Sequence, residues 1–533
     1  MKRPAWLANA VFYQVYPQSF RDANGDGIGD LPGLIEKLDY IRWLGCTAIW
    51  LSPCYVSPFL DAGYDVADYY RVAPRYGTNA DLLRLFAEAR RRGLRVFLDL
   101  VPGHTSIEHP WFTASCRHRR NQYSDYYIWT SDIWDDARGL RSVNGYAERR
   151  GNYVTNFFWC QPALNYGFAK PDPTAPWQQP TTAPGPRAVR AEIKKIMRHW
   201  LDHGAAGFRV DMADSLVKND HDKRATNKLW RDIRAMLERD YPDAALVSEW
   251  SYPIHAIRAG FHMDFAAQFN VPIFNPLFRA PGDAWGRRGY FNARGDGDAC
   301  APLSEYLRHY RATKSQGYIC FQSANHDMAR MSGGRTPREI ETAMAFILTM
   351  PGVPFIYYGD EIGLRMPRDL ASKEGGYQRT ITRTPMQWDT SRNAGFSTAP
   401  ADQLYLPVDR AASRPCVATQ MRNPCSLLHA VRALIALRAA TPALQADGAF
   451  TPLFLEKNTY PLVYLRRTAR QRIIVALNPA GRPATASFRV PGGAGAVTLL
   501  RGRGAKMTSR AMRCTVTLSG ISYGVFEIAP PTR

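Results

Sequence analysis

The 533-residue sequence lacks several of the patterns by which common protein classes are recognised. Its nine cysteines stand at irregular spacings without a Cys-x-x-Cys pair, which argues against a zinc site and against a disulfide framework. No apolar run is long enough to span a bilayer, and the first residues contain no signal-peptide core. We therefore expect a cytoplasmic protein without a membrane partner, or a periplasmic one if a leader has been removed.

Two further absences concern cofactors and nucleic acid. No Gly-x-Gly-x-x-Gly follows the first predicted strand, which argues against a dinucleotide enzyme, and we expect no organic cofactor. The net charge is +21, but the basic residues are scattered in small groups such as residues 90–92, without an interleaved aromatic stripe. A solvated basic surface explains this charge better than a nucleic-acid interface does.

The sequence does contain a repeated order of strand and helix. Its length favours two or three domains. Almost continuously apolar strands alternate with helical segments, a pattern typical of a parallel sheet that is buried on both faces. The eight predicted strands are residues 11–17, 47–53, 94–104, 205–212, 245–250, 261–270, 318–327 and 354–361, and the predicted helices include 31–44, 80–92, 188–203, 225–239 and 426–439. This count predicts an α/β fold, the (β/α)8 TIM barrel, with its chemistry at the carboxyl ends of the strands.

Two stretches interrupt this order. Residues 105–187 are rich in aromatic residues, proline and glycine, and we expect them to form a subdomain, inserted after strand 3, that roofs the cleft. Residues 446–533 contain short alternating segments that predict a C-terminal antiparallel β-sandwich domain. The catalytic barrel would then comprise residues 1–104 and 188–445.

The loop at residues 22–30 has the spacing of oxygen ligands found in the first part of an EF-hand loop. The predicted ligands of a structural Ca²⁺ are the side chains of Asp22, Asn24, Asp26 and Asp30 and the carbonyl of Ile28. Gly33 stands where an EF-hand has its bidentate glutamate, so the loop supplies only about five oxygens. The alternative is a turn of glycine and aspartate whose side chains cap their own main chain.

Polar side chains follow several predicted strands. Arg209 and Asp211 are two residues apart in one strand and therefore point to the same side. We expect Arg209 to lower the pKa of Asp211 and to keep it ionised, which suits a covalent nucleophile, although a structural ion pair has the same appearance. Neighbouring strand ends add Asp99, His104, Glu249, His326 and Asp327.

Four motifs at these strand ends resemble those of the α-amylase superfamily (glycoside hydrolase family 13), which comprises retaining glycoside hydrolases and transglycosylases. They are Asp99-Leu-Val-Pro-Gly-His104, Gly207-Phe-Arg209-Val-Asp211, Ser248-Glu249-Trp and Ala324-Asn-His326-Asp327. The loop at 24–30 and Arg383-Thr-Pro-Met-Gln-Trp-Asp resemble the exo-acting α-glucosidase group, which includes oligo-1,6-glucosidases, sucrose isomerases and trehalose synthases.

The resemblance implies that Asp211 is the nucleophile, Glu249 the general acid/base and Asp327 the stabiliser of the transition state. Retention requires the nucleophile and the acid to be about 5–5.5 Å apart. Glu249 lies between apolar Val247 and Trp250, so desolvation is expected to raise its pKa and to suit it for proton donation. Asp327 would add negative charge beside the oxocarbenium ion.

The resemblance also implies contacts with a small α-glucoside. His104 and His326 would donate to hydroxyls of the −1 sugar, and Asp61 with Arg383 would close the far wall, making the site an exo-acting pocket. Tyr64 would stack under the sugar ring, although ordinary core packing also accounts for a tyrosine there.

Three residues depart from the family pattern. Gly103 replaces an asparagine that is a calcium ligand in amylases, so we expect that interdomain metal site to be absent. Ala163 replaces an aspartate in the roof, and Met212, after the nucleophile, leaves the linkage preference open. The leading hypothesis is an α-glucosidase acting on non-reducing ends. The alternatives are a transglycosylase or isomerase, such as a trehalose synthase or sucrose isomerase, and an inactive relative that serves as a binding subunit.

Overall fold

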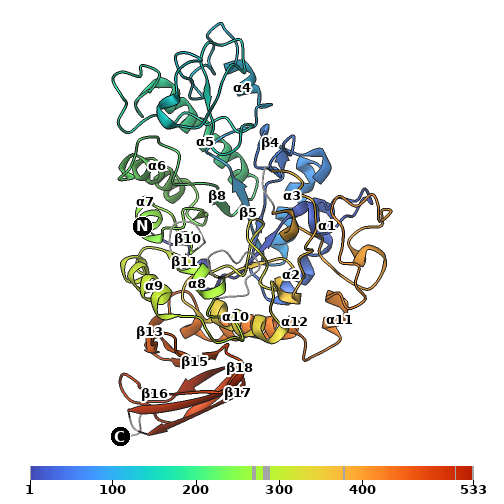
Figure 1. Ribbon diagram of the computed structural model, residues 1–533, viewed down its shortest axis with the longest axis vertical. Coiled ribbons are helices and arrows are strands. Elements are labelled where there is room, and N and C mark those ends of the chain that lie inside the picture. The colour runs from blue at the N-terminus through green and yellow to red at the C-terminus, as the bar shows by residue number, and fades with distance from the viewer. Residues whose placement is uncertain (1, 267–271, 280–288, 376–378, 511, 531–533) are drawn as a thin grey trace.

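The computed structural model shows a central barrel with a smaller domain at each end of its long axis (Figure 1). It describes residues 2–266, 272–279, 289–375, 379–510 and 512–530. The barrel strands are β1 (Phe12–Val15), β2 (Ala48–Leu51), β5 (Arg95–Leu100), β8 (Gly207–Val210), β9 (Ala245–Ser248), β10 (Met263–Phe265), β11 (Tyr318–Cys320) and β12 (Phe355–Tyr357). They form one parallel sheet in the order β11-β10-β9-β8-β5-β2-β1-β12. A parallel bridge between Gln322 and Phe355 closes it, which confirms the predicted barrel.

Helices surround this barrel (Figure 1). They are α1 (Leu31–Glu36), α2 (Leu38–Leu44), α3 (Asn79–Arg91), α5 (Pro184–Asp202), α6 (Arg224–Asp240), α7 (Pro253–Ala259), α8 (Phe274–Phe278), α9 (Cys300–Thr313), α10 (Pro337–Thr349), α11 (Val417–Met421) and α12 (Leu427–Ala440). The helix predicted at 31–44 is divided at Lys37, whose backbone is not helical. Capping boxes start two of the helices, with Thr78 and Asp81 at α3 and Thr336 and Glu339 at α10.

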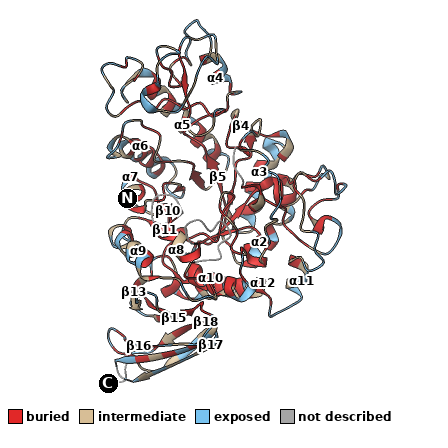
Figure 2. Ribbon diagram, in the orientation of Figure 1, coloured by how far each residue is buried: buried red, intermediate tan, exposed pale blue. Residues whose placement is uncertain are grey.

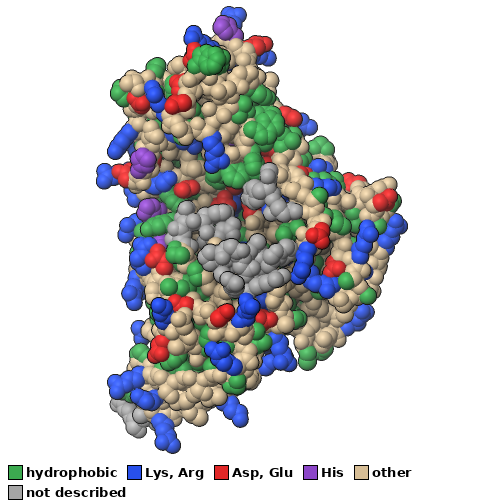
Figure 3. Space-filling model, viewed as in Figure 1, with side chains coloured by type: hydrophobic (Ala, Val, Ile, Leu, Met, Phe, Trp, Pro, Cys, Tyr) green, Lys and Arg blue, Asp and Glu red, His purple; other side chains and the backbone are tan. Residues whose placement is uncertain are grey.

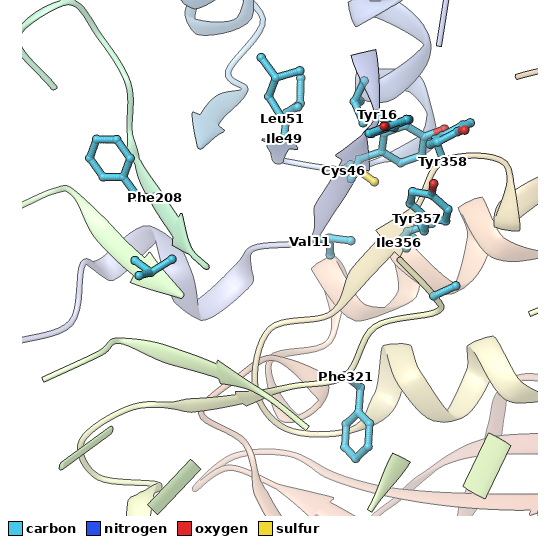
Figure 4. Packing of buried hydrophobic residues seen from close by; sticks show 14 of the residues in the cluster. Val11, Tyr16, Cys46, Ile49, Leu51, Phe208, Phe321, Ile356, Tyr357 and Tyr358 are labelled. Carbon is cyan, nitrogen blue, oxygen red and sulfur yellow. The ribbon is translucent and has the colours of Figure 1, made fainter. Parts of the chain in front are cut away.

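The barrel strands are buried nearly throughout, as their apolar sequences require (Figure 2). Aromatic side chains fill the barrel interior, and the rings of Phe12 and Phe355 stack at 4.4 Å. A second, larger apolar cluster lies between the barrel and its helices, and includes Ile49, Phe208 and Ile356 (Figure 4). Of the strand expected at 261–270, only Met263–Phe265 is strand, and residues 267–270 lie outside the described residues.

The roof follows β5 and lies at the end of the molecule marked by α4 in Figure 1. It contains α4 (Pro110–Ser115) and the short strands β6 (Ser142–Val143) and β7 (Tyr153–Val154). A second hairpin, β3 (Tyr55–Val56) with β4 (Asp68–Val72), follows β2. An antiparallel bridge between His104 and Ala163 ties the roof to the end of β5. Helix α5 begins at Pro184, inside the range of 105–187 expected for the roof. The predicted domain boundaries stay a prediction.

The C-terminal domain is antiparallel, as expected. Its strands are β13 (Ala449–Phe454), β14 (Leu462–Arg467), β15 (Arg472–Asn478), β16 (Ala484–Arg489), β17 (Val497–Arg510) and β18 (Arg513–Ile528). Hydrogen bonds join all six strands into one continuous antiparallel sheet. One half of β18 pairs with β16 and the other half with β15, so this strand connects the two parts that enclose the domain's own apolar core.

The charge on the surface follows the scattered basic groups of the sequence. On the face shown in Figure 3, Lys and Arg side chains are spread over the molecule and do not form a single stripe. Among the described residues, no helix has both the length and the apolar character needed to cross a bilayer.

Candidate active site

The carboxyl ends of the barrel strands border a cavity of about 370 Å³. Six of the predicted site residues line it: Asp61, Tyr64, His104, Asp211, Glu249 and Asp327. The other three predicted catalytic or substrate-binding residues, Arg209, His326 and Arg383, are each only 1 % exposed and lie behind this lining. A larger cavity of about 460 Å³ lies at the opposite ends of β5, β8 and β9, and among the described residues that line it Asp243 is the only acidic one. Since barrel enzymes act at the carboxyl ends of their strands, the smaller cavity is the candidate site.

Arg209 connects three carboxylates of this site. Its Nη1 lies 2.8 Å from Oδ1 of Asp99 and 2.9 Å from Oδ1 of Asp211, and its Nη2 lies 2.8 Å from Oε2 of Glu249. The guanidinium also packs over the rings of Trp50 and Tyr64. One buried cation therefore holds the predicted nucleophile and the predicted acid/base side by side.

The protonation of Asp211 differs from the expectation. Burial raises the pKa of Asp211 to about 7, although the charge of Arg209 acts in the opposite direction. Arg209 lowers this pKa as expected, but the net direction is upward, because desolvation exceeds the attraction of a cation that is shared among three carboxylates. Burial also raises the pKa of Glu249 to about 7, as its apolar neighbours led us to expect.

Asp327 has the opposite environment. His326, Arg379 and Arg383 hold the pKa of its carboxyl well below the usual range, even though burial acts the other way. Nη1 of Arg379 and Nη2 of Arg383 both bind its Oδ1, at 2.9 and 2.8 Å, and Nε2 of His326 lies 3.2 Å from its Oδ2. This carboxylate stays negative at neutral pH.

Asp61 and Arg383, which were expected to close the far wall together, bind different partners. Asp61 forms its ion pair with Arg379, and its Oδ2 accepts a hydrogen bond of 2.7 Å from Nε2 of Gln161 in the roof. Arg383 instead binds Asp327 and the carbonyl of His326. Arg379 and Arg383 flank one short 3-10 helix at Thr380–Thr382, and only Arg379 lines the cavity.

Sequence reasoning therefore missed Arg379 and Gln161. A signal was available for each. Arg379 precedes Arg383 by four residues, a spacing that allows both side chains to reach one acceptor. Gln161 opens the roof segment that contains Ala163, a position that the sequence had already singled out. What the sequence could not show is that these two residues meet at Asp61.

Three ring side chains lie at one wall of the cavity, Tyr64 and His104 in its lining and His326 behind them. The ring of Tyr64 stacks on His326 at 5.1 Å, and its hydroxyl donates to Oδ2 of Asp99 at 3.0 Å. Nδ1 of His326 lies 3.1 Å from the amide of Gln14. Nε2 of His104 lies 3.1 Å from the carbonyl of Tyr64. Stacking of Tyr64 under a sugar and donation by the two histidines stay predictions.

The three residues that differ from the family pattern lie in the lining of the cavity or next to His104. Met212 lines the cavity with a backbone φ of +42°, and its N–H donates to Oε2 of Glu249 at 3.1 Å. Ala163 forms the bridge to His104 described above. A Cβ at Gly103 would lie 2.6 Å from the amide nitrogen of Asn156 in the roof. In the described parts of the chain, no group of three or more acidic, histidine or cysteine side chains is arranged to hold a metal ion.

The loop at 22–30 is closed by its own hydrogen bonds. Asp22 accepts from the main chain of Gly25 and Gly27, and Asp30 accepts from Ala23, Asn24 and Gly33. This arrangement is the self-capped turn considered above. An ionised carboxylate that accepts from a main-chain N–H keeps further lone pairs, so these hydrogen bonds are compatible with a bound cation as well.

Calcium binding at this loop stays a prediction. We expect added Ca²⁺ to raise the midpoint of thermal unfolding of EDTA-treated protein by about a few degrees, because a ligand that binds only the folded state stabilises it. The Asp26→Asn variant should lose this shift, because it removes the charge of one predicted ligand. The fold should remain intact, since Asp26 is exposed. A dialysed protein without bound calcium and without any shift would contradict the prediction.

Comparisons with known proteins agree with this geometry. Residues 14–447 match the model of the alpha-amylase catalytic domain. The chain is 33 % identical over 512 residues to the trehalose synthase/amylase TreS of Mycolicibacterium smegmatis, covering 88 % of this chain and 81 % of that protein. It is 32 % identical over 520 residues to the glucan 1,6-alpha-glucosidase of Streptococcus pneumoniae, covering 89 % and 91 % of the two chains.

Solved structures show the same fold. A variant of the trehalulose synthase MutB from Pseudomonas mesoacidophila, in complex with sucrose, matches with a TM-score of 0.80 at 25 % identity, over 99 % of this chain and all of that one. The family model spans most of the sequence, and the four motifs lie together at the carboxyl ends of the strands. The chain belongs to the alpha-amylase family of glycoside hydrolases and transglycosylases.

Proposed function

We propose that the protein is a retaining α-glucosidase that releases glucose from the non-reducing end of short α-glucosides such as maltose, isomaltose or sucrose. The observation that carries this proposal is the arrangement around Arg209, which holds Asp211 and Glu249 on adjacent nitrogens of one guanidinium beside the cavity. Relatives with this activity support it, among them the glucan 1,6-alpha-glucosidase and an oligo-1,6-glucosidase of Heyndrickxia coagulans.

The first step transfers glucose to the enzyme. A carboxylate oxygen of Asp211 attacks C1 of the sugar while Glu249 gives its proton to the departing glycosidic oxygen. The bond between C1 and that oxygen breaks, the aglycone leaves as an alcohol, and a covalent β-glucosyl ester forms on Asp211. Asp327 carries a full negative charge and stabilises the positive charge that develops on the sugar ring.

The second step returns the enzyme to its initial state. Glu249, now ionised, removes a proton from water, and the water oxygen attacks C1. The ester bond breaks and its electron pair returns to Asp211, so α-glucose is released with its configuration retained. A carboxyl group with a pKa near 7 suits Glu249 to both duties, as acid in the first step and base in the second.

The contacts of Asp61 support exo action. Asp61 is held between Arg379 of the barrel and Gln161 of the roof, and these contacts close the wall beside the sugar-binding residues. A chain that continued past the non-reducing glucose would meet this ion pair. The terminal hydroxyls of one glucose can instead bind to Asp61 and Arg379.

A specific observation also favours isomerisation or transfer on the same site. Trehalose synthases and trehalulose synthase are among the matching proteins at 25–33 % identity. Phe157, Met212 and Trp250 give the cavity an apolar part, which would disfavour water beside the released sugar. A sugar kept there can attack the covalent intermediate in place of water.

Product analysis separates the two functions. The enzyme is incubated with maltose, isomaltose, sucrose and trehalose, each alone, and products are resolved by chromatography over time. Hydrolysis predicts equimolar monosaccharides from the first time point. A new disaccharide that forms before free glucose accumulates would favour the isomerase, and no turnover of any of the four would contradict the α-glucosidase proposal.

The pH profile should report the two carboxyl groups. We expect kcat/KM for maltose to be bell-shaped with a maximum near pH 7, because Asp211 must be ionised and Glu249 protonated, and burial raises each pKa to about 7. Below the maximum Asp211 gains a proton, and above it Glu249 loses one. α-Glucosyl fluoride, whose leaving group needs no proton, should lose the alkaline limb and keep the acidic one. An unchanged alkaline limb with the fluoride would rule out Glu249 as the proton donor.

A further inference from the structure

One side chain of the roof, Asn156, contacts two strand ends of the cavity at once. Its amide nitrogen lies 3.1 Å from Nδ1 of His104 and 3.6 Å from the sulfur of Met212. Its amide oxygen lies 3.4 Å from Nζ of Lys218. His104 follows β5, whereas Met212 and Lys218 follow β8. The mechanism described above gives Asn156 no role, although it touches a residue that faces the sugar.

The neighbours of Asn156 determine which way its amide points. The ammonium of Lys218 can only donate, and it also donates to the carbonyl of Ser215 at 2.8 Å, so the amide atom that faces it is the oxygen. The NH₂ group then faces His104 and donates to Nδ1. A neutral imidazole that accepts at Nδ1 carries its proton at Nε2. The ring is neutral at ordinary pH, since burial lowers the pKa of His104 to about 4.

The backbone around Asn156 fixes this placement. A main-chain hydrogen bond of 3.0 Å from its N–H to the carbonyl of Gln161 closes the roof turn at 156–161. On the barrel side, Gly103 leaves the space into which the amide fits, because a Cβ there would lie only 2.6 Å from the amide nitrogen. The roof turn and the glycine together place one amide against His104.

We propose that Asn156 is a positioning residue that holds His104 in the tautomer protonated at Nε2. Nε2 is the ring nitrogen beside the carbonyl of Tyr64, and both residues line the cavity. The N–H at Nε2 donates to this carbonyl, so the contacts with Asn156 and with Tyr64 favour the same tautomer. The same amide also contacts the sulfur of Met212. The catalytic consequence rests on the proposed function, whereas the tautomer itself does not.

The Asn156→Asp variant tests the tautomer directly. It keeps the size of the side chain but replaces the donor by a carboxylate, which only accepts. Nitrogen NMR of histidine-labelled protein should show Nδ1 of His104 unprotonated in the wild type and protonated in the variant. A His104→Gln variant identifies this signal among the eleven histidines. Protonated Nδ1 in the wild type, or unchanged signals in the variant, would overturn the proposal.

Kinetics test the consequence for turnover. For Asn156→Asp we expect kcat/KM on the best α-glucoside to fall about tenfold, the usual effect of one misdirected hydrogen bond. The matched control is Asn144→Asp, an exposed residue of the roof, which adds the same charge and should change neither kinetics nor NMR signals. Circular dichroism and thermal unfolding identify a folding defect. A changed tautomer with unchanged kcat/KM would overturn the positioning role, whereas a wild type without any glucosidase turnover would contradict only the proposed function.

Discussion

The Asp211→Asn variant is expected to lose turnover of every α-glucoside by about 10⁴-fold or more, which is the scale found when a catalytic nucleophile is removed. The amide is nearly isosteric with the carboxylate, but its nitrogen and carbonyl oxygen cannot form a stable ester with C1. Asp211 accepts from Arg209 at 2.9 Å, and an amide oxygen can preserve this contact. The fold should therefore survive, and steady-state kinetics with maltose should show the loss in kcat.

A second measurement shows the bond itself. Mixing the wild type with 5-fluoro-α-glucosyl fluoride should give one glucosyl adduct by intact-mass spectrometry, and peptide mapping should locate it at Asp211. The Asp211→Asn variant should give no adduct. Asp240→Asn is the control, because Asp240 is an exposed residue at the C-terminal end of α6 and does not line the cavity. Full turnover by Asp211→Asn, or an adduct on another residue, would overturn the nucleophile assignment.

The Arg209→Met variant is expected to lose both stability and activity. Removing the guanidinium leaves Asp99, Asp211 and Glu249 buried together without the cation that they share. Breaking a buried ion pair by removing one partner typically costs about 3–5 kcal/mol of unfolding free energy. The pKa of Asp211 should also rise further, so the nucleophile would be protonated at neutral pH and kcat would fall.

The loss of stability in Arg209→Met should depend on pH. Carboxyl groups whose pKa is higher in the folded than in the unfolded protein stabilise the fold at low pH, and this contribution is lost as pH rises through the folded pKa. In the wild type the values for Asp211 and Glu249 are about 7, and removing Arg209 should raise them. The deficit in melting temperature should therefore be small at pH 4–5 and largest above pH 7.

Arg209→Lys separates charge from geometry. Lysine keeps the positive charge but has one nitrogen, which cannot contact the three carboxylates as the two terminal nitrogens of the guanidinium do. We expect it to recover much of the stability and little of the activity. A melting temperature of Arg209→Met equal to that of the wild type at pH 8 would contradict the structural role of the shared guanidinium.

The pairs of site residues that lie close in the sequence were easiest to predict. Arg209 and Asp211 share a strand, so a separation of two residues is enough to place them on one side. Asp61 and Arg379 illustrate the opposite case. They are 318 residues apart, and whether Asp61 meets Arg379 or Arg383 depends on the turn around Thr380–Thr382 and not on either motif.

The sequence by itself determined the order of strands and helices, the barrel and the set of polar residues at its carboxyl ends. Those features depend on local periodicity and on the rule that parallel strands end at the same edge. Only the tertiary structure decided the partner of Asp61, the contact of Asn156 with His104 and the raised pKa of Asp211. The physical reason is that ion pairing and desolvation depend on which distant segments enclose a group and how completely they exclude water. Neither quantity is encoded in the residues next to it.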